Sequence, residues 1–170
     1  MKVLLMAVIA LFAGSALAQD HQHKHAPYAG MQARAVKALS NQQVADLRAG
    51  RGMGLALAAE LNGYPGPLHV IELADRIGLS GDQRHRVQQL YDAMKLEAVA
   101  VGEKLIAGET ALDRAFKERS ITPERLSELS AAIGKTQGEL RAVHLKYHLT
   151  TTELLTAEQS RQYALLRGYR

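Results

Sequence analysis

Cysteine and tryptophan are absent from the 170-residue sequence, which also contains only two phenylalanines and four prolines. Without cysteine the chain has no disulfide framework and no thiol chemistry. Aromatic residues make up 5% of the chain, so its core must be aliphatic, which suits an elongated helical protein. A strong excess of charge is missing too, because 21 Lys and Arg stand against 17 Asp and Glu. This mild surplus does not favour nucleic acid as a partner.

The first eighteen residues predict a secretory signal peptide. Met1 and Lys2 form a short basic start, residues 3–12 form an apolar stretch, and Ala16-Leu17-Ala18 provides a small-x-small cleavage site. No later run approaches the length of a membrane-spanning helix. We therefore expect export to the periplasm, cleavage after Ala18, no membrane span in the mature chain and no contact with nucleic acid.

The mature N-terminus would carry a histidine-rich tail with His21, His23 and His25. A histidine at the third position of a free N-terminus can complete a square-planar site of four nitrogens, which suits Cu(II) or Ni(II). His-rich tracts also bind metals more generally. The alternative is an ordinary polar tail whose histidines bind metals only adventitiously. Cyclisation of Gln19 would block the terminal amine and remove the four-nitrogen site.

A long apolar pattern between residues 87 and 154 predicts the centre of the fold. Its two halves place apolar or small residues at alternating steps of four and three, which keeps them on one stripe of a helix. The halves are Val87, Tyr91, Met94, Ala98, Val101, Leu105, Gly108, Leu112 and Ala115, then Leu126, Leu129, Ile133, Thr136, Leu140, Val143, Tyr147, Thr150 and Leu154. Between them, Thr122 and Pro123 are typical of an N-cap and a first helical position. We expect an antiparallel helical hairpin.

The glycines inside this hairpin predict close approach of its two backbones. A turn near residues 120–122 would place Gly108 opposite Gly134 and Gly102 near Gly138. Glycine inside a helix costs about 1 kcal/mol relative to alanine, so close approach of the two backbones would explain why glycine occurs at these positions. The alternative explanation is ordinary fraying of the helices. The long stripe also exceeds what one partner helix covers, which predicts a homodimer.

Three stretches have the form Leu-[Ser/Thr]-x-x-Gln, and each predicts a helix start. Ser40, Ser80 and Thr156 would be N-caps, each with glutamine three residues later to complete a capping box. Glycines in residues 50–54 interrupt the first of these helices and indicate a hinge; they lack the strand that a phosphate-binding loop requires. The helix is expected to resume over residues 55–61 and to stop at residues 62–67, and a short helix over residues 68–77 follows. We expect an all-α protein with short flanking helices.

The domain organisation follows from these boundaries. It consists of a signal peptide (1–18), a His-rich tail and linker (19–38), an N-terminal helical segment with a glycine hinge (39–67), and a helical domain (68–170).

The second and third of these motifs, in an exported chain with a long helical hairpin, resemble the LTxxQ family. The matching residues are Leu79, Ser80 and Gln83, then Leu155, Thr156 and Gln159. This family includes chaperones of the Spy and CpxP type and metal sensors and resistance proteins of the CnrX and ZraP type. The resemblance covers roughly residues 68–169 and implies a small all-α protein, often a curved dimer, that works without ATP. This chain departs from it in Ser80, in the extra segment 39–67, and in lacking a membrane anchor.

His144 and His148 are the strongest candidates for a metal site in the hairpin. Their i, i+4 spacing puts both on one helix face, where they can chelate one metal. Metal-sensor relatives carry helix-borne ligands shortly before the last motif, so the resemblance implies the same role here. Met94 and Glu97 on the facing helix could complete the site. The alternative is that the two histidines are half-buried packing residues. Weaker candidates are His69 with Glu72, and His85.

Two functions follow as expectations. The first is a periplasmic envelope-stress protein that binds unfolded or stress-damaged proteins, or a sensor kinase, without ATP or a required cofactor. Apolar contact would come from Met53, Leu55 and Leu57, and positive charge from Arg76, Arg84, His85, Arg86, Arg114, Lys117 and Arg119, which could equally be a solvated helix face. The second is a periplasmic sensor or resistance protein for Cu, Ni or Zn. No nucleophile or phosphate loop supports an enzyme.

Overall fold

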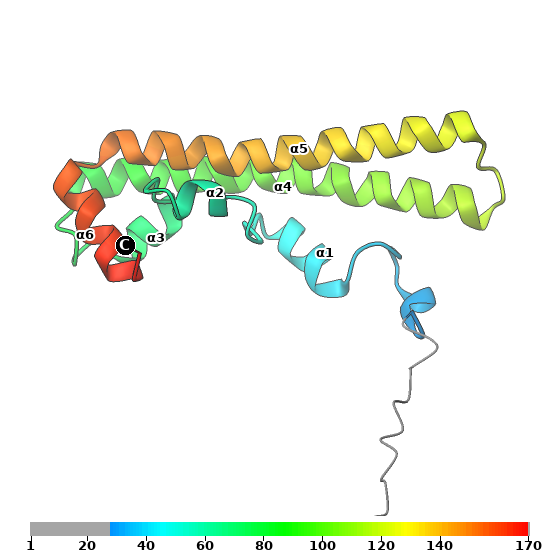
Figure 1. The fold of residues 1–170 in the computed structure, drawn as a ribbon, viewed down its shortest axis with the longest axis horizontal. Helices are drawn as coiled ribbons and strands as arrows, with labels where there is room; N and C mark the ends of the chain where they lie inside the picture. Colours follow the sequence, from blue (N-terminus) through cyan, green and yellow to red (C-terminus); the bar gives the residue numbers. More distant parts are fainter. Residues whose placement is uncertain (1–27, 170) are drawn as a thin grey trace, which may run out of the picture.

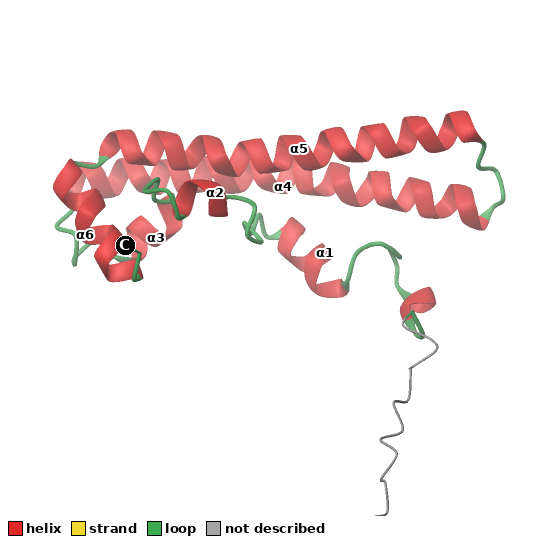
Figure 2. Ribbon diagram, in the orientation of Figure 1, coloured by secondary structure: helices red, strands yellow, loops and turns green. Residues whose placement is uncertain are grey.

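A computed structural model describes residues 28–169, and all regular structure within that range is helical. Helices α4 (Gly81–Lys117) and α5 (Pro123–Leu154) run antiparallel along the whole length of the molecule (Figures 1 and 2). The shorter elements lie along one side of this pair. They are η1 (Met31–Ala33), α1 (Asn41–Arg48), α2 (Leu57–Glu60), α3 (Pro67–Glu72) and α6 (Ala157–Arg167). The predicted all-α fold with a long antiparallel hairpin is confirmed.

The turn of the hairpin follows from its sequence. The Thr122 hydroxyl accepts a hydrogen bond from the Arg125 backbone N–H at 3.2 Å, and Pro123 occupies the first helical position. The pairing of the two helices lies within two positions of the predicted register, because Glu97 of α4 contacts both Lys146 and Tyr147 of α5. The chain therefore returns along the apolar stripe, as its periodicity predicts.

All three capping boxes are present. In each, the Ser or Thr hydroxyl accepts from the N–H of the glutamine three residues later, and that glutamine side chain accepts from the N-cap N–H. Two helices are shorter than predicted. Helix α3 ends at Glu72 because residues 73–79 form successive turns, with Gly78 in a left-handed conformation (φ 67°). Helix α2 has four residues.

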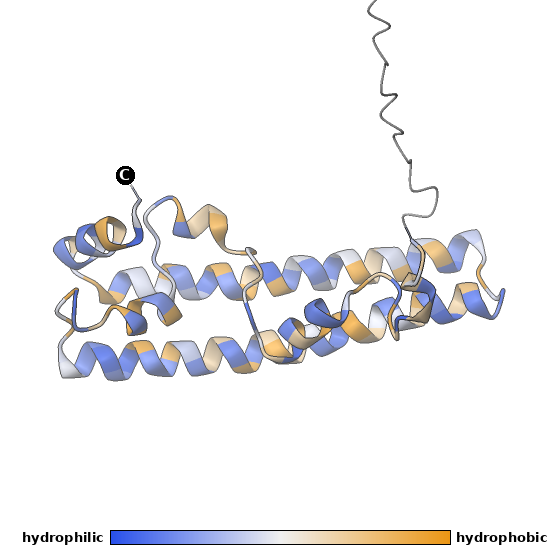
Figure 3. Cartoon of the chain, turned by 90° about the horizontal axis from the view of Figure 1, so that it is seen from below, coloured by the Kyte–Doolittle hydropathy of each residue, from blue (hydrophilic) through white to orange (hydrophobic). Residues whose placement is uncertain are grey.

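Residues 34–66, here called the strap, lie across one side of the hairpin (Figure 1). Val36 and Leu47 of the strap are buried in one hydrophobic cluster with residues of both long helices, including Leu105 and Leu140. From the strap side, apolar turns of the strap are seen over the hairpin (Figure 3). A second cluster, centred on Val70, Val87 and Tyr163, packs α3 and α6 against the first turns of α4. The hairpin therefore has a covered side over much of its length.

The glycine prediction is wrong about the partner of Gly102. A Cβ atom built at Gly102 would lie 2.8 Å from the backbone oxygen of Leu47, so the close approach is to α1 of the strap. At Gly108 a Cβ would lie 3.2 Å from Cγ1 of Ile133. Gly134 and Gly138 have nothing within 4 Å of that position, because both line an open groove between the strap and α5.

No helix among residues 28–169 is both long enough and apolar enough to cross a membrane. The predicted signal peptide and the tail histidines His21, His23 and His25 lie outside the described residues.

Candidate functional site

A buried carboxylate, Glu60, joins the strap to the C-terminal helix. The residue is 6% exposed at the end of α2. Its Oε1 atom accepts hydrogen bonds from the hydroxyls of Tyr163 and, at 3.1 Å, Tyr169. Its Oε2 atom accepts from the Gly66 backbone N–H at 3.2 Å. Burial, and then the bond to Glu60, raises the pKa of Tyr163, so this phenol stays protonated and donates.

Two cationic or titratable side chains complete this group. Arg167 Nε lies 3.5 Å from Glu60 Oε1, and His148 Nδ1 lies 3.7 Å from Glu60 Oε2. His148 Nδ1 also donates to the Tyr64 carbonyl oxygen at 2.6 Å. We call Glu60, His148, Tyr163, Arg167 and Tyr169 the Glu60 cluster. Because its members come from α2, from α5, and from α6 and the residues just after it, the cluster fixes the end of the strap against the C-terminal half of the molecule.

His144 and His148 are both buried and both face the strap. A Cβ at Gly52 would lie 3.8 Å from Nδ1 of His144, and one at Gly66 would lie 2.7 Å from Cε1 and Nε2 of His148. His144 is 2% exposed, and its Nε2 atom has no hydrogen-bond partner. Burial and the neighbouring His148 lower the pKa of His144, so its ring is neutral at pH 7. The packing alternative predicted half-buried histidines, whereas both side chains are buried.

Glu97 does not join these histidines in a ligand group. Its carboxylate accepts from Lys146 Nζ at 2.7 Å and from the Tyr147 hydroxyl at 2.7 Å. The bonds from Lys146 and Tyr147 lower the pKa of Glu97, while burial and the bond to Glu97 raise the pKa of Tyr147 to about 12. Met94 is buried in α4. Among residues 28–169 no three His, Cys, Asp or Glu side chains converge closely enough to hold a metal ion.

The weaker candidates are engaged elsewhere or exposed. His69 Nδ1 lies 2.9 Å from Glu72 Oε2 in an i, i+3 pair. His85 is exposed on α4. Arg84, one of the predicted client-steering cations, pairs with Asp75 at 2.5 Å. In this region, charged side chains on the surface pair with near neighbours. This arrangement agrees with the alternative of an ordinary solvated helix face.

The two motifs of the resemblance meet in space. Gln83 and Gln159 donate to each other at 2.9 Å through their side-chain amides. Gln83 Nε2 also donates to the Leu154 carbonyl at 2.8 Å, and Gln159 Nε2 to the Gly78 carbonyl at 3.2 Å. Each glutamine therefore caps its own helix and also binds the glutamine at the start of the other helix. The sequence alone predicts only the caps.

Exposed apolar side chains gather on residues 53–68, at the end of the strap and the start of α3. They are Met53 (42% exposed), Leu57 (54%), Leu61 (59%), Tyr64 (42%) and Leu68 (39%). Leu55, predicted with Met53 and Leu57 as an apolar contact, instead packs against the core. Five large apolar side chains are thus exposed within sixteen consecutive residues, a density that folding of the chain alone does not explain. We call these five side chains the apolar row.

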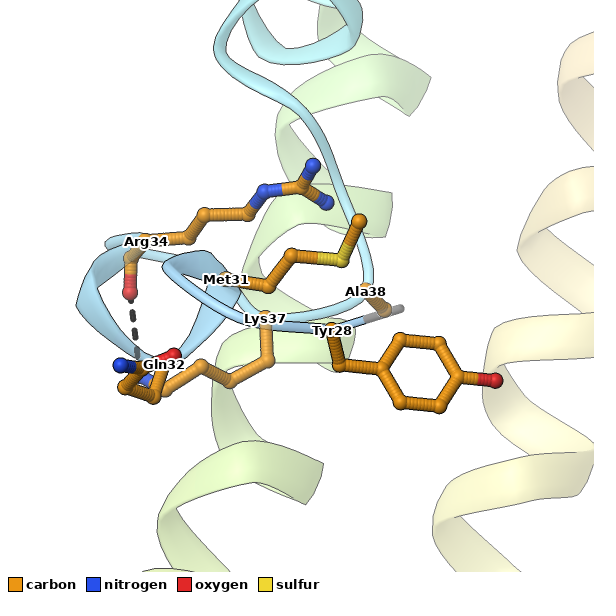
Figure 4. A pocket seen from close by; sticks show the side chains of 6 residues that line it. All are labelled: Tyr28, Met31, Gln32, Arg34, Lys37 and Ala38. Carbon is orange, nitrogen blue, oxygen red and sulfur yellow. Dashed lines mark hydrogen bonds between the residues drawn. The ribbon is translucent and has the colours of Figure 1, made fainter. Parts of the chain in front are cut away.

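Two hollows flank the beginning of the strap. A groove of about 510 Å³ lies between the strap and α5, lined by Leu39, Gln43, Leu47, Met53, Leu55, Leu105, Gly134, Gln137, Gly138, Leu140 and Arg141. A second hollow of about 560 Å³ lies around η1, lined by Tyr28, Met31, Gln32, Arg34, Lys37 and Ala38 (Figure 4). Neither contains a convergent set of titratable groups.

Sequence reasoning missed the central residue of the site, Glu60. The available signal was a single carboxylate inside the otherwise apolar run of residues 55–61. Charged residues are almost never fully buried unless they are paired, so such a position is ambiguous until its partners are known. Those partners, Tyr163, Arg167 and Tyr169, lie more than one hundred residues away along the chain.

Comparison with known proteins found no family model, no curated protein and no solved structure that matches this chain.

Proposed function

We propose that this protein is an exported, ATP-independent binding protein for unfolded or damaged polypeptides, in the manner expected for the LTxxQ family. The observation that carries the proposal is the apolar row on residues 53–68. Unfolded chains expose apolar side chains in irregular order, and a surface of Met, Leu and Tyr on a short-helix segment can adapt to many of them. Binding of this kind needs no nucleotide and no catalytic residue.

The setting of the apolar row supports this function. The row is carried by a strap anchored at Glu60 and docked on a long, well-capped hairpin. The apolar side chains therefore lie on a segment that contains little helix, and two long helices hold this segment in position. Loops and short elements held by a rigid scaffold are the usual location of binding surfaces.

The first test is suppression of client aggregation in metal-free buffer without nucleotide. We expect the mature chain to suppress aggregation of a chemically denatured enzyme, and the double variant Leu57→Gln/Leu61→Gln to require several-fold more protein for the same effect. Truncating exposed apolar contacts removes binding energy without opening a core. Light scattering measures the result.

The matched control is Leu96→Gln/Leu165→Gln, because these leucines are 75% and 70% exposed and lie outside the apolar row. The control should suppress aggregation like the unmodified chain. Equal loss in both double variants would show that the apolar row has no special role. No suppression by the unmodified chain would remove the proposed function altogether.

A second candidate function, binding of Cu, Ni or Zn, is favoured by one observation. The buried Nε2 atom of His144 has no hydrogen-bond partner, and a second imidazole follows one turn later at His148. The fit is partial. Glu97 is engaged by Lys146 and Tyr147, so the described residues supply two imidazoles, whereas a structural zinc site takes four protein ligands. Further ligands would have to come from residues 19–27 or from a second copy.

Calorimetric titration with Cu(II), Ni(II) and Zn(II) separates the two metal sites. We expect a truncated chain that begins at residue 26 to bind more weakly than the mature chain, because the tail histidines and terminal amine are lost. If the helical body holds metal, the truncated chain still binds and His144→Ala weakens that binding about tenfold or more. His85→Ala, an exposed histidine, is the control. Absence of binding by either chain would eliminate metal binding.

A further inference from the structure

The strap hides an apolar face of the hairpin, and we propose that this covered face is itself a binding surface, with the strap as its built-in competitor. The ligands that fit the face are apolar segments flanked by Lys or Arg. The inference rests on the proposed function and adds where the larger binding surface lies and which clients it selects.

The covered face is a continuous apolar surface. Beneath the strap, the hairpin contributes the buried residues Ala98, Leu105, Ile106, Ile133 and Leu140, with Val101, Leu112 and Val143 partly buried around them. The strap covers them with Val36, Leu39, Val44, Leu47 and Leu55. Monomeric proteins rarely leave so large an apolar surface exposed. Departure of the strap would therefore create a strong site for another apolar segment.

The strap has little structure of its own. Helix α1 has eight residues and α2 has four, and helices shorter than about 12–15 residues are marginal in water without packing partners. Four residues of the strap have positive φ: Gly50, Met53, Gly54 and Gly63. The hairpin helices have 37 and 32 residues. Docking, rather than local propensity, holds the strap in place, so it can leave while the hairpin stays folded.

Two ion pairs define the charge that a competing segment needs. Lys37 Nζ lies 3.2 Å from Asp113, and Arg48 Nε lies 3.1 Å from Glu103. In both pairs the strap supplies the cation and α4 the carboxylate. Exposed pairs of this kind add little stability, but unmatched carboxylates beside an apolar face disfavour acidic segments and favour basic ones. The clients that replace the strap should therefore resemble it in combining apolar side chains with Lys or Arg.

Gly102 provides a way to loosen the strap. Any side chain there would place its Cβ 2.8 Å from the backbone oxygen of Leu47 and push α1 away. Gly134 is the matched control, because it also lies inside a long helix and a Cβ there meets nothing within 4 Å. A second route is Arg48→Glu, which places like charges opposite each other without changing the core.

The test measures binding of a fluorescent peptide with the sequence of residues 36–55 to the full mature chain. We expect Gly102→Ala to bind it at least about tenfold tighter than the unmodified chain, and Arg48→Glu to bind it several-fold tighter, because the uncovered fraction is larger in both variants. Gly134→Ala should bind like the unmodified chain. The same peptide with Lys37→Glu and Arg48→Glu should bind several-fold more weakly to Gly102→Ala. Fluorescence anisotropy measures all five affinities.

Hydrogen exchange of residues 41–48 verifies strap release in the same variants. Faster exchange there, with unchanged protection in α4 and α5, together with tighter peptide binding supports the proposal. If Gly102→Ala does not fold, Arg48→Glu decides. Unchanged exchange, or release without tighter binding, overturns the proposal. The proposed function fails only if the unmodified chain does not suppress aggregation, so the two failures are distinguishable.

Discussion

Replacing Glu60 with alanine is expected to lower the free energy of unfolding by about 3–5 kcal/mol, because it removes one partner of a buried ionic group. The substitution leaves the hydroxyls of Tyr163 and Tyr169 and the Gly66 N–H without an acceptor. It also leaves Arg167 without its carboxylate. Urea unfolding followed by circular dichroism measures the loss, and a smaller slope against urea would show that the strap separates before the hairpin unfolds.

Two variants define what this result means. Glu60→Gln keeps the volume and one acceptor oxygen, so it should fall between alanine and the native residue. Glu72→Ala removes a carboxylate from the exposed pair with His69 and should change stability by less than about 1 kcal/mol. If Glu60→Ala costs no more than Glu72→Ala, the Glu60 cluster does not stabilise the docked strap.

The helices could be predicted because their signals are local. The capping boxes at Ser40, Ser80 and Thr156 form between residues three apart, and the hairpin stripe is read directly from apolar spacing. The register followed from the turn at Thr122 and Pro123. These features depend on near neighbours in the chain and were correct to within a few residues.

The strap could not be predicted because its contacts are distant in sequence. Gly102 is explained by Leu47 and not by a facing glycine on α5, and nothing in the spacing of either residue indicates that contact. The partners of Glu97 were missed for a related reason. The register was nearly right, but His144 and His148 face the strap, so the α5 side chains that reach the Glu97 carboxylate are those of Lys146 and Tyr147.

The contact between the two Leu-[Ser/Thr]-x-x-Gln motifs should be visible as an energetic coupling. We expect Gln83→Ala and Gln159→Ala each to cost about 2 kcal/mol, the sum of a lost cap and lost tertiary hydrogen bonds. The double variant should cost less than the sum of the two by about 1 kcal/mol, since the amide pair is lost only once. Urea unfolding of the four chains measures this cycle.

Gln43→Ala is the internal control, because Gln43 closes the same capping box at Ser40 without contacting another motif. It should cost about 1 kcal/mol or less, the value of the cap alone. Gln83→Glu should be worse than Gln83→Ala, since a carboxylate cannot donate to the Leu154 carbonyl and places two acceptors face to face. Additive losses at Gln83 and Gln159, equal to that at Gln43, would mean that both motifs are helix caps and nothing more. Coupled losses would mean that Gln83 and Gln159 join the start of the hairpin to the C-terminal helix. The Glu60 cluster holds the strap at the same end of the molecule.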